Sequence, residues 1–247
     1  REKFSLAASY MAGKADGSRP GTFYFSGYNV AERELGTSIS LYMHEGNPGH
    51  HFQSMFAIEN EDLPEFMRYG GFTAFSEGWG LYAESLGYEL GLYDDPVERL
   101  KALEGGEMLR AVRLVVDTGM HALGWSREQA IEYMVANGAA RDFAESESAR
   151  YIVMPAQALA YKTGELKIKQ LRARAEAALG EDDALAMPSD GEWAHPLLAL
   201  VRPSRVVGAL RGGDRRPLHV QFTEMPHTLM LEDPVVLRNV NTPEDLE

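Results

Sequence analysis

A histidine-rich segment falls where a helical pattern is interrupted, so the chain must turn or bulge among its histidines. Between residues 34 and 57 the apolar side chains recur at mainly helical spacing, and Pro48-Gly49 breaks this pattern. Proline has no backbone N–H and clashes with the preceding turn, so a regular helix does not continue through it. The break lies inside the segment 44–51, which reads His-Glu-Gly-Asn-Pro-Gly-His-His, and so separates His44 from His50 and His51.

The pair His44-Glu45 begins like the H-E-x-x-H helix, in which two histidines hold zinc and the glutamate polarises the attacking water. Position 48 would share the face of His44 but is proline, so the second ligand is His50 or His51. In an unbroken helix His51 returns within about 20° of His44, whereas His50 lies about 120° away. If residues 48 and 49 bulge out as extra residues, His50 takes the second position. We favour His50, with His51 as the alternative.

A third ligand is expected from the aromatic segment 75–84, which carries two glutamates seven residues apart on one helical face. A carboxylate on such an apolar helix is costly to bury unless it is paired, hydrogen-bonded or bound to a metal. We therefore predict Glu77 as the third metal ligand and Glu84 as the residue that orients a histidine.

Composition narrows the kind of partner. The chain has no cysteine, so histidine and carboxylate are the strong metal ligands available. The formal charge of -13, without a basic stripe, argues against nucleic acid. No apolar run approaches the roughly 18 to 20 residues needed to cross a bilayer, so no membrane span is expected. Small or peptidic partners remain, and the compartment stays open between the cytoplasm and an exported, periplasmic location.

Helical patterns dominate the chain after residue 70. Before it, Thr22–Phe25 is a β-branched and aromatic run that follows turn formers, which is typical of a short β hairpin or edge strand. The helices are expected from Gly71 or Thr73 to Gly91, from Asp95-Pro96, from an N-cap at Ser126, and from Ala144 to Leu179 with breaks at Pro155 and Gly164. The sequence therefore predicts a mainly α fold with a short β element near the amino terminus.

The character of the chain changes after Gly180. Of the 12 prolines, 7 fall in the last 67 residues, and no helical or alternating period persists there. We expect residues 1–180 to form a metal-binding catalytic domain that lacks an amino-terminal part, and residues 181–247 to form a divergent, poorly ordered tail.

Downstream side chains suit the other needs of metal-assisted amide hydrolysis. Tyr151 or Tyr161 can donate a hydrogen bond to the developing oxyanion, and Arg150 can hold a substrate carboxylate bidentately. The alternative is that both tyrosines are core residues with satisfied hydroxyls. A polar ladder along one helix is expected from Arg110, Arg113, Asp117 and His121.

With these motifs the chain resembles the bacterial family known as domain of unknown function 885, whose members look like helical zinc peptidases of the gluzincin type. The resemblance rests on residues 16–24, 44–53, 77–84, 110–121 and 150–164. The pattern is also similar to the carboxypeptidase Taq family and to dipeptidyl peptidases of the third type. The resemblance implies a helical metallopeptidase-like domain with one zinc ion, His44, His50 and Glu77 as ligands, and Glu45 as general base.

We therefore expect a zinc-dependent hydrolase of peptide bonds that acts on a peptide or another amide. Tyr24, in the Thr22–Phe25 strand, is expected to contact the substrate, because edge strands pair with extended peptides. The alternative is a truncated or catalytically silent metal-binding or scaffold protein. Glu45 discriminates between them, because a structural zinc site is usually closed by four protein ligands and needs no free carboxylate.

Overall fold

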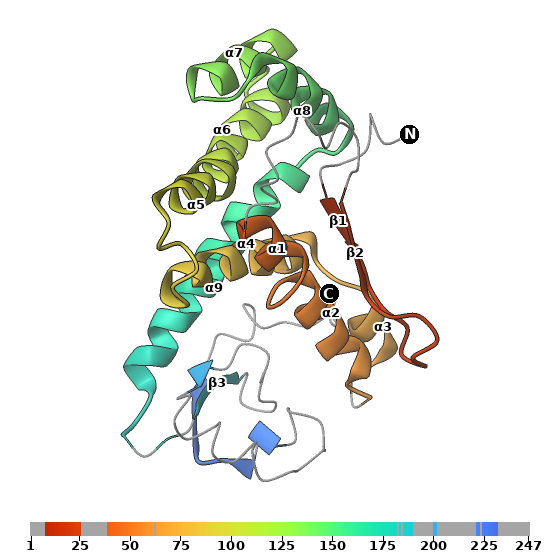
Figure 1. Ribbon diagram of the computed structural model, residues 1–247, viewed down its shortest axis with the longest axis vertical. Helices are drawn as coiled ribbons and strands as arrows, with labels where there is room; N and C mark the ends of the chain where they lie inside the picture. Colours follow the sequence, from red (N-terminus) through yellow and green to blue (C-terminus); the bar gives the residue numbers. More distant parts are fainter. Residues whose placement is uncertain are drawn as a thin grey trace. The chain divides into compact units, whose positions relative to one another are not determined.

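The computed structural model describes residues 8–25, 39–61, 63–181, 183, 185–189, 200–201, 221–222 and 224–231. In this part of the chain the fold is mainly helical, with a two-stranded antiparallel sheet near the amino terminus (Figure 1). The predicted fold class is confirmed. The chain divides into two compact units, residues 1–58 with 69–166 and residues 59–68 with 167–247, which we describe separately.

The first unit contains the predicted hairpin. Strand β1, Ala8–Met11, pairs antiparallel with β2, Thr22–Phe25. In the connection, the Asp16 carboxylate accepts a hydrogen bond of 2.9 Å from the backbone N–H of Ser18, which is the side-chain turn that aspartate favours. The strand predicted at residues 22–25 is confirmed.

The histidine-rich segment spans two short helices. Helix α1, Ile39–Glu45, ends before the break, and α2, His50–Glu59, begins after it. A Cβ on Gly49 would come within 1.9 Å of the carbonyl oxygen of His44, so only glycine fits where the turn approaches α1 this closely. The predicted interruption is confirmed, but residues 46–49 form a turn between two helices rather than a bulge within one.

Four further helical segments run from α4 to α6. Helix α4 is Thr73–Glu89, and α5, Pro96–Lys101, begins where the Asp95 side chain accepts a hydrogen bond of 2.8 Å from the backbone N–H of Val97. A π-helical stretch, Ala102–Met108, then leads into α6, Leu109–Ala122. Because this stretch contacts both α1 and α4, the first turn of α6 is held close to them.

Helices α7, Arg127–Ala136, and α8, Arg141–Val153, pack with α6 around an apolar core. The predicted N-cap is confirmed, because Ser126 forms a reciprocal capping box with Gln129 at the start of α7. The buried members of the core are Val112, Val116, Ala130, Ile131, Met134, Ala144, Tyr151 and Ala158. This core fixes the relative positions of α6 and α8, both of which carry residues of the candidate site.

Helix α9, Gln157–Ala178, begins after the predicted break at Pro155. The break predicted at Gly164 is wrong, because Gly164 lies inside α9. A Cβ at this position would come within 1.9 Å of the carbonyl oxygen of Ala74 and 2.8 Å of the Cα of Gly78, both in α4. Gly164 therefore permits the close packing of α9 on α4 and does not end a helix.

The second unit contains most of α3, Glu65–Tyr69, the later turns of α9 and a small sheet. In this sheet β3, Leu185–Ser189, pairs antiparallel with β4, Leu200–Val201, and parallel with β5, His227–Leu231. Most of the predicted tail, residues 181–247, lies outside the described residues. The division into a domain of residues 1–180 and a tail stays a prediction.

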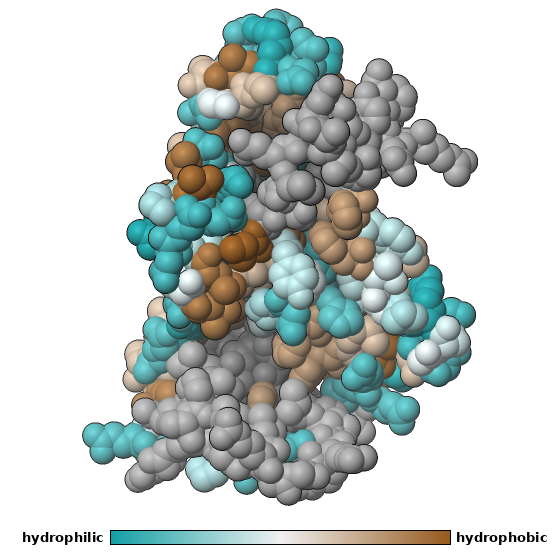
Figure 2. All heavy atoms as spheres, viewed as in Figure 1, coloured by the Kyte–Doolittle hydropathy of each residue, from teal (hydrophilic) through white to brown (hydrophobic). Residues whose placement is uncertain are grey.

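Hydrophobic side chains also occur on the surface of the helices. Figure 2 shows them in brown over α5, where Val97 and Leu100 are exposed, whereas the region of α7 is mainly hydrophilic. Exposed apolar side chains of this kind are normal on globular proteins. Among the helices of the described residues, none combines the length and the apolar character that a bilayer crossing requires.

Candidate metal centre

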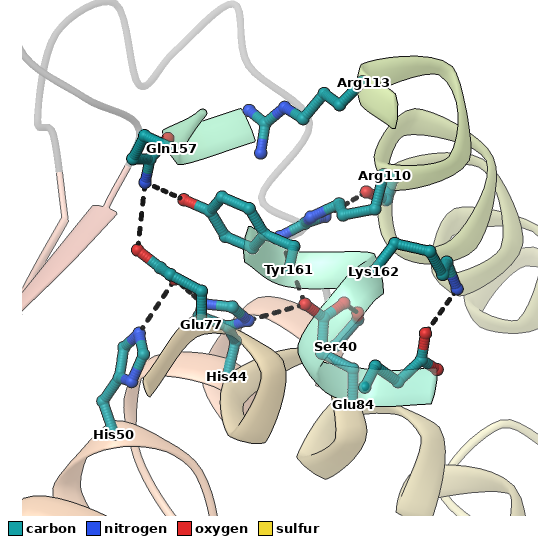
Figure 3. A network of polar contacts seen from close by, with 12 residues as sticks. Ser40, His44, His50, Glu77, Glu84, Arg110, Arg113, Gln157, Tyr161 and Lys162 are labelled. Carbon is teal, nitrogen blue, oxygen red and sulfur yellow. Dashed lines mark hydrogen bonds and ion pairs between the residues drawn. The ribbon is translucent and has the colours of Figure 1, made fainter. Parts of the chain in front are cut away.

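Three side chains from three helices converge in the first unit (Figure 3). His44 lies near the end of α1, His50 opens α2, and Glu77 lies in the second turn of α4. The Nε2 atoms of both histidines lie 3.4 Å from Oε2 of Glu77. Each residue offers one ligand atom, and the three atoms lie within 4.8 Å of one another. The group has the size and the donors to hold a metal ion.

His51, the alternative second ligand, faces another part of the unit. Its Nδ1 lies 2.9 Å from the hydroxyl of Tyr10 on β1, and the two rings meet edge to face. Neighbouring residues in a helix point about 100° apart, so only one of the two adjacent histidines can face Glu77. The structure places the favoured His50 there and directs His51 toward the hairpin.

Glu84 contacts the ring of His44 on the side away from Glu77. Its Oε1 accepts a hydrogen bond of 2.8 Å from Nδ1 of His44 and one of 3.2 Å from Arg110, and its Oε2 accepts one from Ser40. Burial raises the pKa of the Glu84 carboxyl, but Arg110 and His44 outweigh burial and hold it below its usual value. An ionised Glu84 fixes the proton of His44 on Nδ1 and leaves Nε2 free to act as a ligand.

The electrostatics of Glu77 and His44 are coupled. Burial raises the pKa of Glu77, but the hydrogen bonds with His44 and His50 outweigh it, so this pKa lies well below its usual range. Burial lowers the pKa of His44, but Glu77 and Glu84 outweigh burial and raise it. The second oxygen of Glu77 accepts a hydrogen bond of 3.2 Å from Gln157. The group thus combines a half-buried, ionised carboxylate with two imidazoles.

Tyr161 of α9 lies beside this group, with its ring 6.0 Å from that of His44. The guanidinium groups of Arg110 and Arg113 lie 5.3 and 4.9 Å from the centre of the same ring, within the range of cation–π interactions. The Tyr161 hydroxyl accepts a hydrogen bond of 3.0 Å from Gln157, which also contacts Glu77. One glutamine therefore links the tyrosine hydroxyl to the metal-ligand group (Figure 3).

Tyr151 is placed differently from Tyr161. It is 1% exposed in the apolar core, and its hydroxyl accepts a hydrogen bond of 2.8 Å from Nε of Arg113. Arg113 also donates to Glu147 at 2.7 Å. Burial raises the pKa of Tyr151 and outweighs the opposite effect of Arg113. The structure therefore gives Tyr151 a place in the support of Arg113.

The expected polar ladder on α6 is incomplete: His121 acts electrostatically on Asp117, but the hydrogen bonds of its members go to other elements. Arg110 reaches Glu84 on α4 and Arg113 reaches Glu147 on α8. The carboxylate of Asp117 accepts from the backbone N–H of Ala156, and His121 contacts the backbone carbonyl of Tyr151. The spacing of three to four residues thus places these side chains on one face that packs against the neighbouring helices.

The remaining predicted residues differ in whether hydrogen bonds connect them to the metal-ligand group. Arg150 donates hydrogen bonds of 3.0 Å to Gln157 and 3.4 Å to the Tyr161 hydroxyl, so it is joined to the group through Gln157. Glu45 directly follows His44 as the last residue of α1 and is half-buried. Tyr24 on β2 is 47% exposed. None of the contacts described among these residues joins Glu45 or Tyr24 to the group.

Sequence reasoning missed Gln157, Ser40 and the contacts of Arg110. Gln157 was a predicted helix residue without a role, although it bonds to Glu77, Tyr161 and Arg150. The one available signal was its place at the helix start after Pro155, where a polar side chain can project past the end of the preceding helix. Ser40, one turn before His44, carried no distinguishing signal.

The described fold and group define a class: a mainly helical protein with a two-histidine, one-carboxylate group set in a buried ionic network. Within that class, the chain belongs to the family described as bacterial protein of unknown function (DUF885), whose model matches residues 1–186. No curated protein matches the chain significantly. The resemblance to DUF885 read from the sequence is therefore confirmed. The match assigns no function, and the resemblance to zinc peptidases stays a prediction.

Solved structures of bacterial proteins resemble the chain. A protein from Colwellia psychrerythraea, described as a "putative lipoprotein", is 41% identical with a TM-score of 0.67, and the match covers 73% of this chain and 31% of that one. A second, from Shewanella oneidensis and described as a "putative lipoprotein of unknown function", is 23% identical with a TM-score of 0.54, covering 69% and 33%. The second likeness shows the fold alone. The chain spans about a third of the length of these relatives.

Proposed function

We propose that the chain is a zinc-dependent hydrolase of peptide bonds, a metallopeptidase. The observation that carries this proposal is the convergence of His44, His50 and Glu77, with Glu45 directly following the first of them. Two imidazoles and one carboxylate are a common ligand set of catalytic zinc. Because the group supplies three ligands and zinc prefers four, a position remains for water or substrate.

The surroundings of the group fit a divalent cation. His44 is held by Glu84 so that its Nε2 points toward Glu77, as the histidine ligands of metals are usually held. The half-buried, ionised Glu77 favours a positive partner, and a cation between the three ligand atoms supplies one. The chain has no cysteine, so its metal ligands are histidine nitrogen and carboxylate oxygen. Zinc binds both kinds of donor, so this group can hold it.

Each neighbouring residue has a role in this proposal. Zinc held there would supply Lewis-acid polarisation of the substrate carbonyl and of the attacking water. Glu45 accepts the proton of the water and returns it to the leaving amine. Tyr161 donates a hydrogen bond to the developing oxyanion, and Gln157 keeps its hydroxyl beside Glu77. Arg150 binds a substrate carboxylate.

Tyr151 and Tyr24 have supporting roles in the proposed reaction. Tyr151 acts through Arg113, because its hydroxyl is buried in a hydrogen bond with that residue. Tyr24 is exposed on β2 and is kept as a contact for the more distant part of an extended substrate.

The experiment compares zinc content and peptide cleavage in the wild type, Glu77→Ala and Glu145→Ala. Glu145 is an exposed glutamate of α8, so its variant controls for the loss of one carboxylate. We expect near-stoichiometric zinc and cleavage of a mixed peptide library in the wild type and the control, and loss of both in Glu77→Ala. No zinc in the wild type under zinc-replete conditions sinks the proposal.

Zinc without cleavage would support the competing function, a catalytically silent metal-binding or scaffold protein. The coverage of the relatives bears on this alternative, because the chain spans about a third of their length. The same assay should therefore be repeated on a protein of the relatives' full length. Peptide cleavage by that longer protein would show that cleavage requires the two thirds of the relatives' length that this chain does not match.

We also propose that the protein is exported. The description of the Colwellia relative as a "putative lipoprotein" supports a lipid-anchored location outside the cytoplasm. Fractionation of host cells tests this, and recovery of the protein in the cytoplasmic fraction contradicts it.

A further inference from the structure

A pocket of about 530 Å³ opens one helical turn from Glu77. On α4 it is lined by Thr73 and Ala74, which lie four and three residues before Glu77 and therefore on the same helical face. On α9 it is lined by Gln157, which lies four residues before Tyr161. The pocket thus lies along the same α4–α9 contact as the metal-ligand group, displaced toward the amino-terminal ends of both helices by about 5.4 Å.

The lining of the pocket is mainly apolar and carries no charge. Met154, Pro155, Leu159 and Ala160 form apolar walls, and no ionisable side chain is among the lining residues. The volume lies within the range of about 300 to 1,000 Å³ that small-molecule sites occupy. The pocket therefore suits an apolar side chain and disfavours a charged one.

Positive charge lies beside the pocket. Arg150 donates a hydrogen bond of 3.0 Å to Gln157, which lines the pocket, and 22% of its side chain is exposed. Arg113 and Arg150 share a single carboxylate, that of Glu147, at 2.7 and 3.5 Å. Two guanidinium groups beside one carboxylate leave one positive charge uncompensated within this trio. An anionic group of a ligand would complete the pairing.

The separation between Arg150 and Glu77 is within the reach of one peptide residue. Hydrogen bonds of 3.0 and 3.2 Å to the two ends of the Gln157 amide connect them, so the guanidinium nitrogen lies less than about 9 Å from the Glu77 carboxylate oxygen. One residue of extended chain spans about 3.3 to 3.6 Å, and a polar contact of about 3 Å at each end brings the total to about 9 to 10 Å. A single residue can therefore reach from the metal-ligand group to Arg150.

We propose that this site takes the carboxy-terminal residue of a peptide, with its apolar side chain in the pocket and its free carboxylate at Arg150. The inference rests on the proposed function and narrows it to a carboxypeptidase that prefers apolar terminal residues. Water adds across the last peptide bond: its oxygen bonds to the carbonyl carbon and the C–N bond breaks. Glu45 transfers a proton from the water to the leaving amino group, so the products are a shortened peptide and a free amino acid.

The test measures binding separately from cleavage. Zinc-loaded Glu45→Gln, which removes the proposed base, is titrated by calorimetry with acetyl-Ala-Leu, with its carboxy-terminal amide and with acetyl-Ala-Gly. We expect acetyl-Ala-Leu to bind at least about tenfold more tightly than either comparison ligand, because the amide lacks the charged contact and glycine leaves the pocket empty.

Two added substitutions should separate the two contacts. Arg150→Met should abolish the preference for the free acid over the amide and keep the preference for leucine over glycine. Thr163→Trp fills the pocket from an exposed position of α9. It should abolish the preference for leucine over glycine and keep the preference for the free acid over the amide. Leu166→Trp adds the same side chain at an exposed position of α9 outside the pocket lining and should keep both preferences. The preference that each variant retains shows that it is folded.

Equal binding of the acid and the amide, or a leucine preference that survives Thr163→Trp, overturns the inference. Cleavage of internal peptide bonds by the zinc-loaded wild type would then leave the proposed function standing. Failure of the zinc-loaded wild type to cleave any peptide overturns the proposed function, and the inference with it. The two failures are thus distinguishable.

Discussion

Replacing Gly164 by alanine should push α9 away from α4 and destabilise the first unit. The new Cβ would lie 1.9 Å from the carbonyl oxygen of Ala74 and 2.8 Å from the Cα of Gly78. Both are backbone atoms, so no side-chain rotation relieves the overlap and the helices themselves must move. Overpacking costs typically about 1 to 3 kcal/mol, and a backbone clash belongs at the upper end. Alanine regains about 1 kcal/mol of helix propensity, which leaves a net loss of about 2 kcal/mol.

Urea unfolding followed by circular dichroism measures this loss, and the melting temperature should fall by about 4 to 8 °C. Gly105→Ala is the matched control, because a Cβ on Gly105 meets nothing within 4 Å and its helical stretch gains the same propensity. Zinc affinity should fall in Gly164→Ala alone, because α4 carries Glu77 and α9 carries its partner Gln157. If Gly164→Ala is as stable as Gly105→Ala, the close α4–α9 contact is refuted.

Three further substitutions test the site and its support. Glu84→Gln should weaken zinc binding about 10- to 100-fold in chelator competition, and unchanged affinity would show that Glu84 does not orient His44. Tyr161→Phe should lower kcat on peptides about a hundredfold with little change in KM, whereas an unchanged kcat rules out its oxyanion role. Burial raises the pKa of Glu147, but the charge of Arg113 outweighs burial and lowers this pKa. The ionised carboxylate therefore stabilises the fold above its unfolded pKa of about 4.3, and this stabilisation is lost as the pH falls below that value. Glu147→Gln should therefore flatten the fall of the melting temperature in acid, and an equally steep fall speaks against the ion pair.

Signals that act over a few residues predicted much of the fold. Asp95 and Ser126 begin helices because their side chains accept hydrogen bonds from backbone N–H groups two or three residues later. The break at Pro48 follows from a missing backbone N–H. The spacing of Glu77 and Glu84 predicted that both would lie on one face of α4, and both contact His44. In each case the physical cause lies within two helical turns of the residue.

Contacts between distant parts of the chain were beyond such reasoning. Arg113 and Glu147 are 34 residues apart, and Gln157 and Glu77 are 80 residues apart. The polar ladder on α6 is incomplete for this reason: i, i+3 and i, i+4 spacing shows which side chains share a face but not which helix covers that face. Gly164 was misread in the same way, because the backbone that requires a glycine there belongs to α4.

The two helix breaks show why the direction in which a side chain points is harder to predict than the helix that carries it. Residues ten apart, such as Tyr151 and Tyr161, would point about 80° apart on one continuous helix. The chain instead leaves its helix at residues 154–156, where Ala156 has a φ of 68°, and α9 starts with a new rotation. Asp117 on α6 fixes this break, because its carboxylate accepts the backbone N–H of Ala156 at 3.1 Å. The position of Tyr161 beside His44 therefore depends on a contact made by α6, just as the choice of His50 over His51 depends on the turn that Gly49 permits.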